Sequence, residues 1–378
     1  MPEDAFQQFK DTEDWRVAND IDVLYRTIDV SAYEQSRRLV RPFPVPTTIT
    51  QQPMLTATQY PQWTGRRDRR GIPLYVFEVR SLDSKTISEY EKSGANSTFS
   101  EAKTDGKTAP GLLRLFALYE NLTRFSQPFC SQLTDREYPD VPITLSTNIV
   151  DISGVGLKQF WNLKSHMQAA SQLATAHYPE TLDRIFIIGA PVFFSTVWGW
   201  IKRWFDPITV SKIFILDPSE VKSTLEGFIE PRNIPKKYGG ELDFAFGRPP
   251  VPDSSWEGVI SWEKGYSIFP TGPLLWEEID GGKRLACVSY GTEGGEKRTE
   301  RVCTLPRVWP PQEEEKKVNG VAGDDKTEEK TAEPAATEPE ATNEDAVTNG
   351  KDMEKLNIAD EAEKQKDVAP SDVAPAIA

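Results

Sequence analysis

Two oppositely charged side chains at the ends of an apolar segment are the residues of this chain best placed to bind something. Residues 178–216 carry a carboxylate near their start, Glu180, and an ammonium near their end, Lys212, with the Thr209 hydroxyl close to the lysine. Much of the sequence between them is apolar or aromatic. A carboxylate accepts hydrogen bonds from hydroxyl groups, while an ammonium and a hydroxyl suit a phosphate. This segment therefore predicts a site for an amphiphile, with apolar surface for its tails and an acid and a base for its headgroup.

Patterns typical of enzymes do not occur in the sequence. The two histidines, His166 and His177, lack the spacing of metal ligands, so packed or capping helix residues are the simpler interpretation. The Gly-Val-Gly of residues 154–156 lacks the third glycine of a dinucleotide fingerprint. Neither a GxSxG motif nor a GxxxxGK[ST] phosphate loop occurs. We therefore predict a protein that is not an enzyme, with no catalytic residue, metal or cofactor.

The segment 192–205 is predicted to be a helix that is apolar nearly all round. Such a helix must be covered on several sides or lie against lipid, and a fully buried core helix is the alternative. A carrier of a diacyl lipid needs this much apolar surface, because roughly thirty methylenes are each worth about 0.8 kcal/mol when kept from water. The candidate residues for this acyl-chain surface are Phe193, Phe194, Val197, Trp198, Ile201, Trp204 and Phe205.

Charge is spread unevenly along the 378 residues. The net charge is −14, but residues 311–378 hold 19 acidic and 8 basic residues, a net charge of −11, which leaves −3 for the other 310. This tail has almost no aromatic residues, so it is predicted to be disordered, and its acidity argues against nucleic acid as a partner. Three cysteines without metal spacing suit a reducing compartment, and residues 1–10 do not resemble a signal peptide. We therefore expect a cytoplasmic location.

The predicted strands and helices alternate, which implies a mostly parallel sheet covered by helices. Residues 1–39 are predicted to be helical, 40–59 a proline-rich insertion, and 246–310 a small β-rich extension, either an appendage or an extra layer on the main domain. The predicted strands lie at 72–79, 143–150, 184–188 and 212–216, and the predicted helices at 111–125, 157–177, 192–205 and 219–228.

Several strings occur together in the order of a known family: YPQWTGRRDRRGIPLYVFEV at 60–79, NIVDISGVGL at 148–157, YPE at 178–180, GAPVFFS at 189–195, DPITVSKI at 206–213 and IPKKYGG at 234–240. With them, residues 60–245 resemble the CRAL-TRIO lipid-binding domain, in the branch of the fungal phosphatidylinositol/phosphatidylcholine transfer proteins. The resemblance implies an α/β fold in which a mostly parallel sheet floors an apolar lipid pocket closed by a gate helix. It also implies that the helical segment before the domain is a shortened version of the family's.

The resemblance assigns roles to the residues named above. Glu180, Thr209 and Lys212 match the family's phosphatidylinositol headgroup site. The apolar helix 192–205 matches its gate helix, which moves at the membrane to open the pocket. A phosphatidylcholine subsite carries over less completely: Tyr75, Tyr119, Ser146 and Asn148 stand at its positions, with asparagine in place of a threonine and Thr64 in place of a tyrosine. Tyr75 and Tyr119 as plain core aromatics remain the alternative to this subsite.

The leading interpretation is a non-enzymatic carrier, and its ligand is a phospholipid. It would exchange phosphatidylinositol between membranes and present it to inositol-lipid metabolism, as a monomer that docks transiently on a membrane surface. Two alternatives remain open. One is a carrier of another hydrophobic ligand, such as a sterol or a different phospholipid. The other is a protein-interaction or regulatory module with a vestigial pocket.

Overall fold

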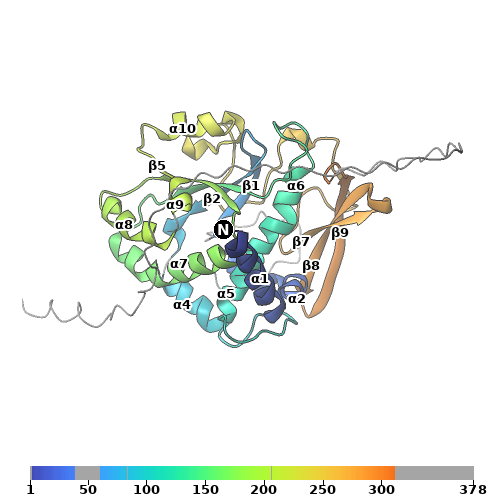
Figure 1. Cartoon of the computed structure of the whole chain (residues 1–378). Coiled ribbons are helices and arrows are strands. Elements are labelled where there is room, and N and C mark those ends of the chain that lie inside the picture. The colour runs from blue at the N-terminus through green and yellow to red at the C-terminus, as the bar shows by residue number, and fades with distance from the viewer. Residues whose placement is uncertain (1, 39–59, 83, 206, 311–378) are drawn as a thin grey trace, which may run out of the picture. The chain divides into compact units, whose positions relative to one another are not determined.

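The computed structural model describes residues 2–38, 60–82, 84–205 and 207–310 (Figure 1). The predicted proline-rich insertion at 40–59 and the predicted disordered tail at 311–378 lie outside the described residues. The α-helices are α1 (Pro2–Ala18), α2 (Ile21–Thr27), α3 (Val30–Arg38), α4 (Ser84–Ser93), α5 (Pro110–Asn121), α6 (Gln127–Ser131), α7 (Leu157–His177), α8 (Phe194–Ile201), α9 (Pro207–Ser211) and α10 (Val221–Phe228). The strands are β1 (Gln62–Arg67), β2 (Pro73–Glu78), β3 (Ser146–Asp151), β4 (Leu182–Ile188), β5 (Ile213–Ile215), β6 (Ser261–Trp262), β7 (Leu274–Ile279), β8 (Arg284–Glu293) and β9 (Glu296–Pro306).

Short helical turns complete the described elements. A π-helical turn, η2 (Leu122–Ser126), joins α5 to α6. The 3-10 turns are η1 (Val79–Ser81), η3 (Lys202–Trp204), η4 (Pro231–Asn233), η5 (Lys236–Tyr238), η6 (Ser254–Trp256) and η7 (Asp280–Gly282).

The main sheet has the mostly parallel organisation that alternating strands and helices predict. Its order is β1-β2-β3-β4-β5; β1 is antiparallel to β2, and every other pair is parallel. Parallel neighbours need a crossover connection, which the helices between successive strands supply. The fold class predicted from the sequence is therefore confirmed.

Different elements cover the two faces of the main sheet, because successive side chains of a strand point to opposite faces. On one face, β4 contributes Phe186 and Ile188 to a cluster with Leu225 of α10 and the turns that follow it. On the other face, Ile185 and Ile187 pack against α8. Figure 1 shows α10 on one side of the sheet, with α5 and α7 on the opposite side.

Residues 246–310 form an extra layer that shares a core with the main domain. Their antiparallel sheet has the order β6-β9-β8-β7. Phe129 of α6 stacks on Trp256 at 3.6 Å between ring centroids and on Trp276 at 5.5 Å. The same cluster contains Trp63 and Tyr75 of the main sheet. One continuous core therefore joins both sheets.

The N-terminal helices pack on α5 and on this second sheet. Leu24 and Ile28 are fully buried in a cluster with Leu113 of α5. The Tyr25 hydroxyl donates to the Leu274 carbonyl oxygen of β7 at 2.8 Å and accepts from the Leu274 N–H at 3.0 Å. Together these contacts tie the first described segment to both layers.

Some predicted boundaries were wrong. The helix predicted at 192–205 is shorter: α8 ends at Ile201 and continues as the 3-10 turn η3. Phe205, after η3, is extended with φ −119° and ψ 152°, so the apolar pattern outlasts the α-helix. The strand predicted at 143–150 begins only at Ser146, and helix α4 was not predicted.

Candidate functional site

Glu180 and Lys212, 32 residues apart in sequence, meet at one end of the main sheet. The Lys212 Nζ lies 3.3 Å from the Glu180 Oε2 and donates to the Leu182 carbonyl oxygen at 3.0 Å. Parallel pairing of β4 with β5 places them there, because the Ile185 N–H donates to the Lys212 carbonyl oxygen. The Glu180 side chain is 80% exposed and that of Lys212 25%. The pair therefore offers an accessible acceptor beside a partly sheltered cation.

Thr209 lies in α9, one turn before Lys212. Its carbonyl oxygen accepts from the Lys212 N–H at 3.1 Å, which closes the turn between helix and strand. The threonine is half-buried. The three residues predicted for a headgroup site thus lie in the turn just before β4 and at the α9–β5 junction.

The backbone at Glu180 has a conformation that few residues other than glycine adopt. Its φ is +54°, in the left-handed region. The turn is held on both sides: the Thr181 Oγ1 donates to the Tyr178 carbonyl oxygen at 3.0 Å, and the Ser146 Oγ donates to the Thr181 carbonyl oxygen at 3.0 Å. Backbone strain of this kind persists where the surroundings determine the conformation, and it is common at functional sites.

An apolar face of the main sheet extends away from this pair. Across the parallel strands, Asn148, Ile185 and Ile213 are in register, and the next inward positions are Val150 and Ile187. Helix α8 packs directly on this face. The residues of α8 and its ends that join the shared cluster are Phe193, Phe194, Val197, Trp198 and Ile201. Five of the seven predicted acyl-chain residues therefore belong to the apolar cluster that joins α8 to the sheet.

The outward side of α8 carries one exposed tryptophan beside the exposed Ser195 and Thr196. Trp200 contacts Trp161 of α7, which is exposed as well, at 5.2 Å between ring centroids with the rings tilted by 35°. Val192, just before the helix, is fully exposed. Phe205, the sixth predicted acyl-chain residue, is half-buried after η3, and the seventh, Trp204, belongs to η3. The inward side of the helix is thus apolar and buried, whereas its outward side is mixed and exposes Trp200.

The predicted phosphatidylcholine subsite is only partly assembled. The Asn148 Nδ2 donates to the Ser146 Oγ at 3.1 Å, and Tyr75 is the register partner of Asn148 on β2. Tyr75 is buried, and its hydroxyl shares a 2.7 Å hydrogen bond with the Ser126 Oγ. Burial raises the pKa of this hydroxyl, against the effect of that hydrogen bond. Tyr119 belongs instead to an aromatic stack with Tyr178, at 5.1 Å between centroids.

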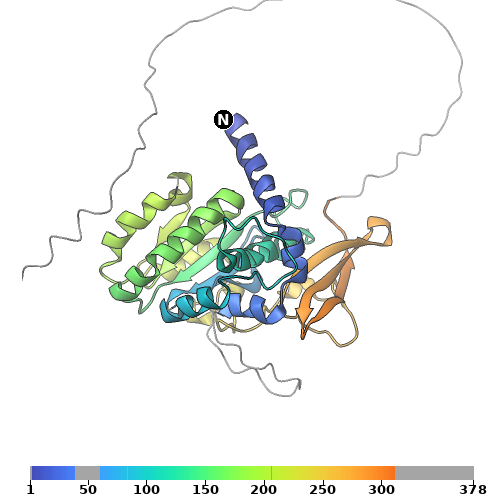
Figure 2. The ribbon, with the colours of Figure 1, turned by 90° about the horizontal axis from the view of Figure 1, so that it is seen from below.

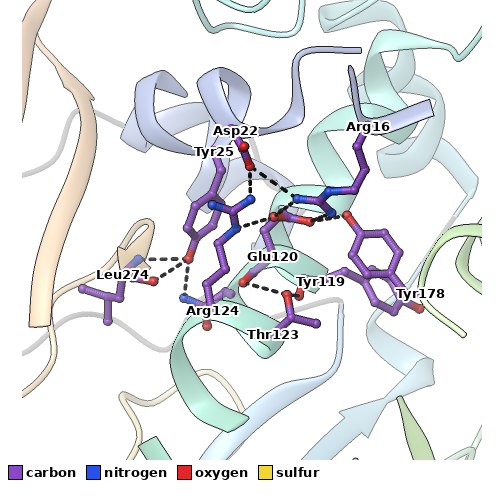
Figure 3. Close-up of polar contacts among 10 residues, drawn as sticks. Arg16, Asp22, Tyr25, Tyr119, Glu120, Thr123, Arg124, Tyr178 and Leu274 are labelled. Atoms are coloured by element: carbon purple, nitrogen blue, oxygen red, sulfur yellow. Dashed lines mark hydrogen bonds and ion pairs between the residues drawn. The ribbon is translucent and has the colours of Figure 1, made fainter. Parts of the chain in front are cut away.

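A buried ion-pair cluster centred on Glu120 was not predicted from the sequence (Figure 3). The Glu120 side chain is fully buried; its Oε1 accepts from the Arg16 Nη1 at 2.7 Å and from the Tyr178 hydroxyl at 2.6 Å. Its Oε2 accepts from the Arg124 Nε at 2.5 Å and the Arg16 Nη2 at 3.0 Å, and both arginines also pair with Asp22. The i,i+4 spacing of Glu120 and Arg124 is a local signal, but Arg16 and Tyr178 come from distant parts of the chain.

The electrostatics of this cluster favour the ionised carboxylate. Burial alone would raise the pKa of the Glu120 carboxyl, but the hydrogen bond from Arg16 and the positive charges of Arg124 and Arg16 outweigh burial, so the pKa lies below its ordinary value. Glu120 is therefore held as a carboxylate between two arginines. It also accepts a hydrogen bond from Tyr178, which lies two residues before Glu180.

The histidines have structural partners. The His166 Nε2 contacts the Tyr60 hydroxyl, and its Nδ1 lies 3.2 Å from the Glu91 Oε1. The His177 ring stacks on Trp15. Within residues 2–38, 60–82, 84–205 and 207–310, no group of three or more His, Cys, Asp or Glu side chains could hold a metal ion. Over the same ranges, no helix has the length and apolar content needed to cross a bilayer.

These features define an α/β domain whose main sheet carries a helix-covered apolar face, with an acid and a base at its edge. Residues 57–240 match the family model described as the CRAL/TRIO domain. The chain therefore contains a CRAL/TRIO domain, as the sequence strings indicated.

Similar proteins extend the comparison. The chain is 30% identical over 220 residues to a SEC14 cytosolic factor of Candida glabrata, covering 58% of this chain and 64% of that protein. It is 26% identical over 245 residues to the phosphatidylinositol/phosphatidylcholine transfer protein SFH7 of Arabidopsis thaliana, covering 63% and 36%. It thus spans less than two thirds of the length of each. The solved structure of Sfh5 aligns with a TM-score of 0.35 at 17% identity, over 52% of this chain and 60% of that one.

Proposed function

We propose that this protein binds a phospholipid and transfers it between membranes without catalysing a reaction. The observation that carries the proposal is the Glu180–Lys212 pair at the edge of an apolar sheet face that α8 covers. The family of the domain and the printed names of the relatives, which include a phosphatidylinositol/phosphatidylcholine transfer protein, support the same class of ligand.

The preferred ligand is phosphatidylinositol. Inositol hydroxyls would donate to the exposed Glu180 carboxylate, while the phosphate would pair with the Lys212 ammonium and the Thr209 hydroxyl. The acyl chains would lie against the face that Val150, Ile185 and Ile213 share, displacing α8 side chains from it. A choline headgroup fits less well, because Tyr75 is committed to the core and Tyr119 to the Tyr178 stack.

The exposed side of α7 and α8 supports transient docking on an anionic membrane. Tryptophan is favoured at the bilayer interface, where its ring meets both acyl chains and headgroups. Helix α7 contains no acidic residue, although the whole chain has a net charge of −14. The Lys164 Nζ lies 5.0 Å from the centre of the Trp161 ring. We call this the membrane-docking surface; its residues are Trp161, Lys164, Val192, Trp200, Lys202 and Arg203.

The headgroup assignment is tested by identifying the bound lipid. Protein purified from cells is extracted with organic solvent, and its lipids are identified by mass spectrometry; one phosphatidylinositol per protein is expected. Glu180→Ala and Lys212→Ala are each expected to abolish phosphatidylinositol transfer between vesicles while leaving the folded protein intact. A matched control is Lys297→Ala, which removes another exposed ion pair, the 2.9 Å contact with Glu101.

Any other result of these experiments would change the proposed ligand or its binding site. A different bound lipid would retain the carrier and overturn the phosphatidylinositol headgroup site. A folded protein that carries no lipid and transfers none would overturn the carrier and favour the protein-interaction module. Transfer unchanged in both pair variants would show that the acid and the base do not hold the headgroup.

The membrane-docking surface is tested by sedimentation with vesicles. The Trp200→Ala variant is expected to reduce binding to vesicles that contain phosphatidylserine several-fold, and raised salt is expected to weaken the remaining binding because charge attraction is screened. Binding unchanged in Trp200→Ala would place the docking surface elsewhere.

A further inference from the structure

Helix α1 is attached to the C-terminal end of α7, just before the Glu180 turn. The Gln8 Nε2 donates to the Thr175 carbonyl oxygen at 3.2 Å, and the Thr12 Oγ1 donates to the Ala176 carbonyl oxygen at 3.2 Å. The last carbonyl groups of a helix have no partner within it. Side chains from one face of α1 therefore cap the end of α7.

The same face of α1 also holds the next two residues, His177 and Tyr178, the first directly and the second also through Glu120. The Trp15 ring stacks on His177 at 4.0 Å between centroids and 7° between planes. Arg16 then pairs with Glu120, which accepts the Tyr178 hydroxyl hydrogen bond. The Trp15 ring also meets Tyr178 edge-on at 6.5 Å between centroids. Side chains of α1 thus contact residues 175 to 178, the last of which stands two positions before Glu180.

Only part of the length of α1 is packed on the domain. The N-terminal end of α1 projects away from the neighbouring helices in Figure 2, and Phe6 and Phe9 are 67% and 64% exposed. The half that contains Thr12, Trp15 and Arg16 is the part packed on the domain. Contact is therefore concentrated where α1 meets the end of α7.

The ring of Tyr178 also makes contacts with other aromatic side chains. Its ring stacks on Phe116 at 5.4 Å between centroids and 7° between planes, and contacts Tyr119 at 5.1 Å with the rings tilted by 30°. Glu120, which fixes its hydroxyl, is itself held between Arg16 and a second arginine. A tyrosine so fixed limits the positions open to the strained Glu180 turn.

We propose that α1 is a positioning element of the headgroup site: through Arg16, Glu120 and Tyr178 it holds Glu180 where it faces Lys212. The inference rests on the proposed function of that pair and adds a regulatory consequence. Any change that detaches α1 from the end of α7 would loosen the grip on an inositol headgroup, while the apolar face that takes the acyl chains would be left as it is.

The test is a double-mutant cycle on phosphatidylinositol affinity in the full chain. Tyr178→Phe removes only the hydroxyl bond to Glu120 and keeps the stacked ring. It is expected to weaken binding about five- to tenfold in the wild-type background and not at all in the Glu180→Ala background. Arg16→Met, which keeps the apolar stem, is expected to behave the same way; Phe9→Ala on the exposed side of α1 is the control and changes nothing.

The outcomes separate the inference from the proposed function. If Glu180→Ala leaves affinity unchanged, both the headgroup assignment and the role of α1 are wrong. If Glu180→Ala weakens binding but Tyr178→Phe and Arg16→Met do not, the headgroup site stands and the positioning role is overturned. Equal effects of Tyr178→Phe with and without Glu180 would also overturn it, because the tyrosine would then act independently of the glutamate.

Discussion

Replacing Glu180 by glycine should separate stability from binding. A left-handed backbone costs an L-residue about 1–2 kcal/mol, and Glu180 has a φ of +54°. Glycine avoids that cost but loses about 0.4–1 kcal/mol to the greater freedom of the unfolded chain. The ion pair with Lys212 is largely exposed, so its loss lowers the free energy of unfolding by only about 0–1 kcal/mol. The Glu180→Gly variant is therefore expected to be within about 1 kcal/mol of the wild type.

The matched comparison is Glu180→Ala, which loses the same ion pair but keeps a side chain in the left-handed region. Glu180→Gly should exceed it in free energy of unfolding by about 1 kcal/mol. Both variants are expected to bind phosphatidylinositol much more weakly than the wild type, although one is the more stable protein. Urea unfolding followed by tryptophan fluorescence gives the first quantity, and vesicle-based binding gives the second.

The reasoning would be refuted in either of two ways. If Glu180→Ala is as stable as Glu180→Gly, the backbone at this position is not strained. If binding declines only in proportion to the loss of stability, the glutamate supports the fold and does not hold a headgroup.

Two further predictions concern stability, and a third concerns the pKa of a carboxyl group. Glu120→Gln should lower the free energy of unfolding by about 3 kcal/mol at pH 7, since two arginines lose their buried carboxylate. Because folding lowers the pKa of Glu120, the ionised carboxylate contributes fully to the free energy of unfolding above about pH 4.3, and this contribution is lost as the pH falls through the lower pKa of the folded state. Urea unfolding should therefore show that the stability of Glu120→Gln depends less on pH than that of the wild type over this acidic range. Phe129→Ala should cost about 3–5 kcal/mol yet keep one cooperative unfolding transition, whereas two separate transitions would show that the sheets are independent. The hydrogen bond from Arg67 lowers the pKa of Asp135 to about 2; NMR should find that value, and Arg67→Met should return it toward about 3.9.

The parts of the fold that the sequence predicted are those set by short-range patterns. Apolar periodicity placed α7 at Leu157–His177, and alternation of strands with helices indicated the parallel sheet. The meeting of Glu180 with Lys212 was within reach because each lies next to a parallel strand of the same sheet. Whether either residue holds a headgroup stays a prediction.

What the sequence did not predict depends on contacts between distant segments. Glu120 occupies an ordinary helical position, and its partner Arg16 lies 104 residues away. The sharing of one core by both sheets likewise rests on Phe129 meeting Trp256 and Trp276. The apolar pattern of a segment shows which of its side chains are buried, but it does not show which distant segment buries them. Such contacts therefore cannot be predicted from local periodicity.

The two faces of the main sheet differ in how completely their apolar residues are covered. On the α10 side, Leu74, Ile149 and Phe186 have no exposed surface, so removing their cover would bring the whole of that apolar area into water. On the α8 side, Val150 and Ile185 remain half-exposed with the helix in place. In the proposed carrier, α8 would be the movable cover, and acyl chains would replace its contacts with buried residues such as Ile187 on the face that ends at Glu180 and Lys212.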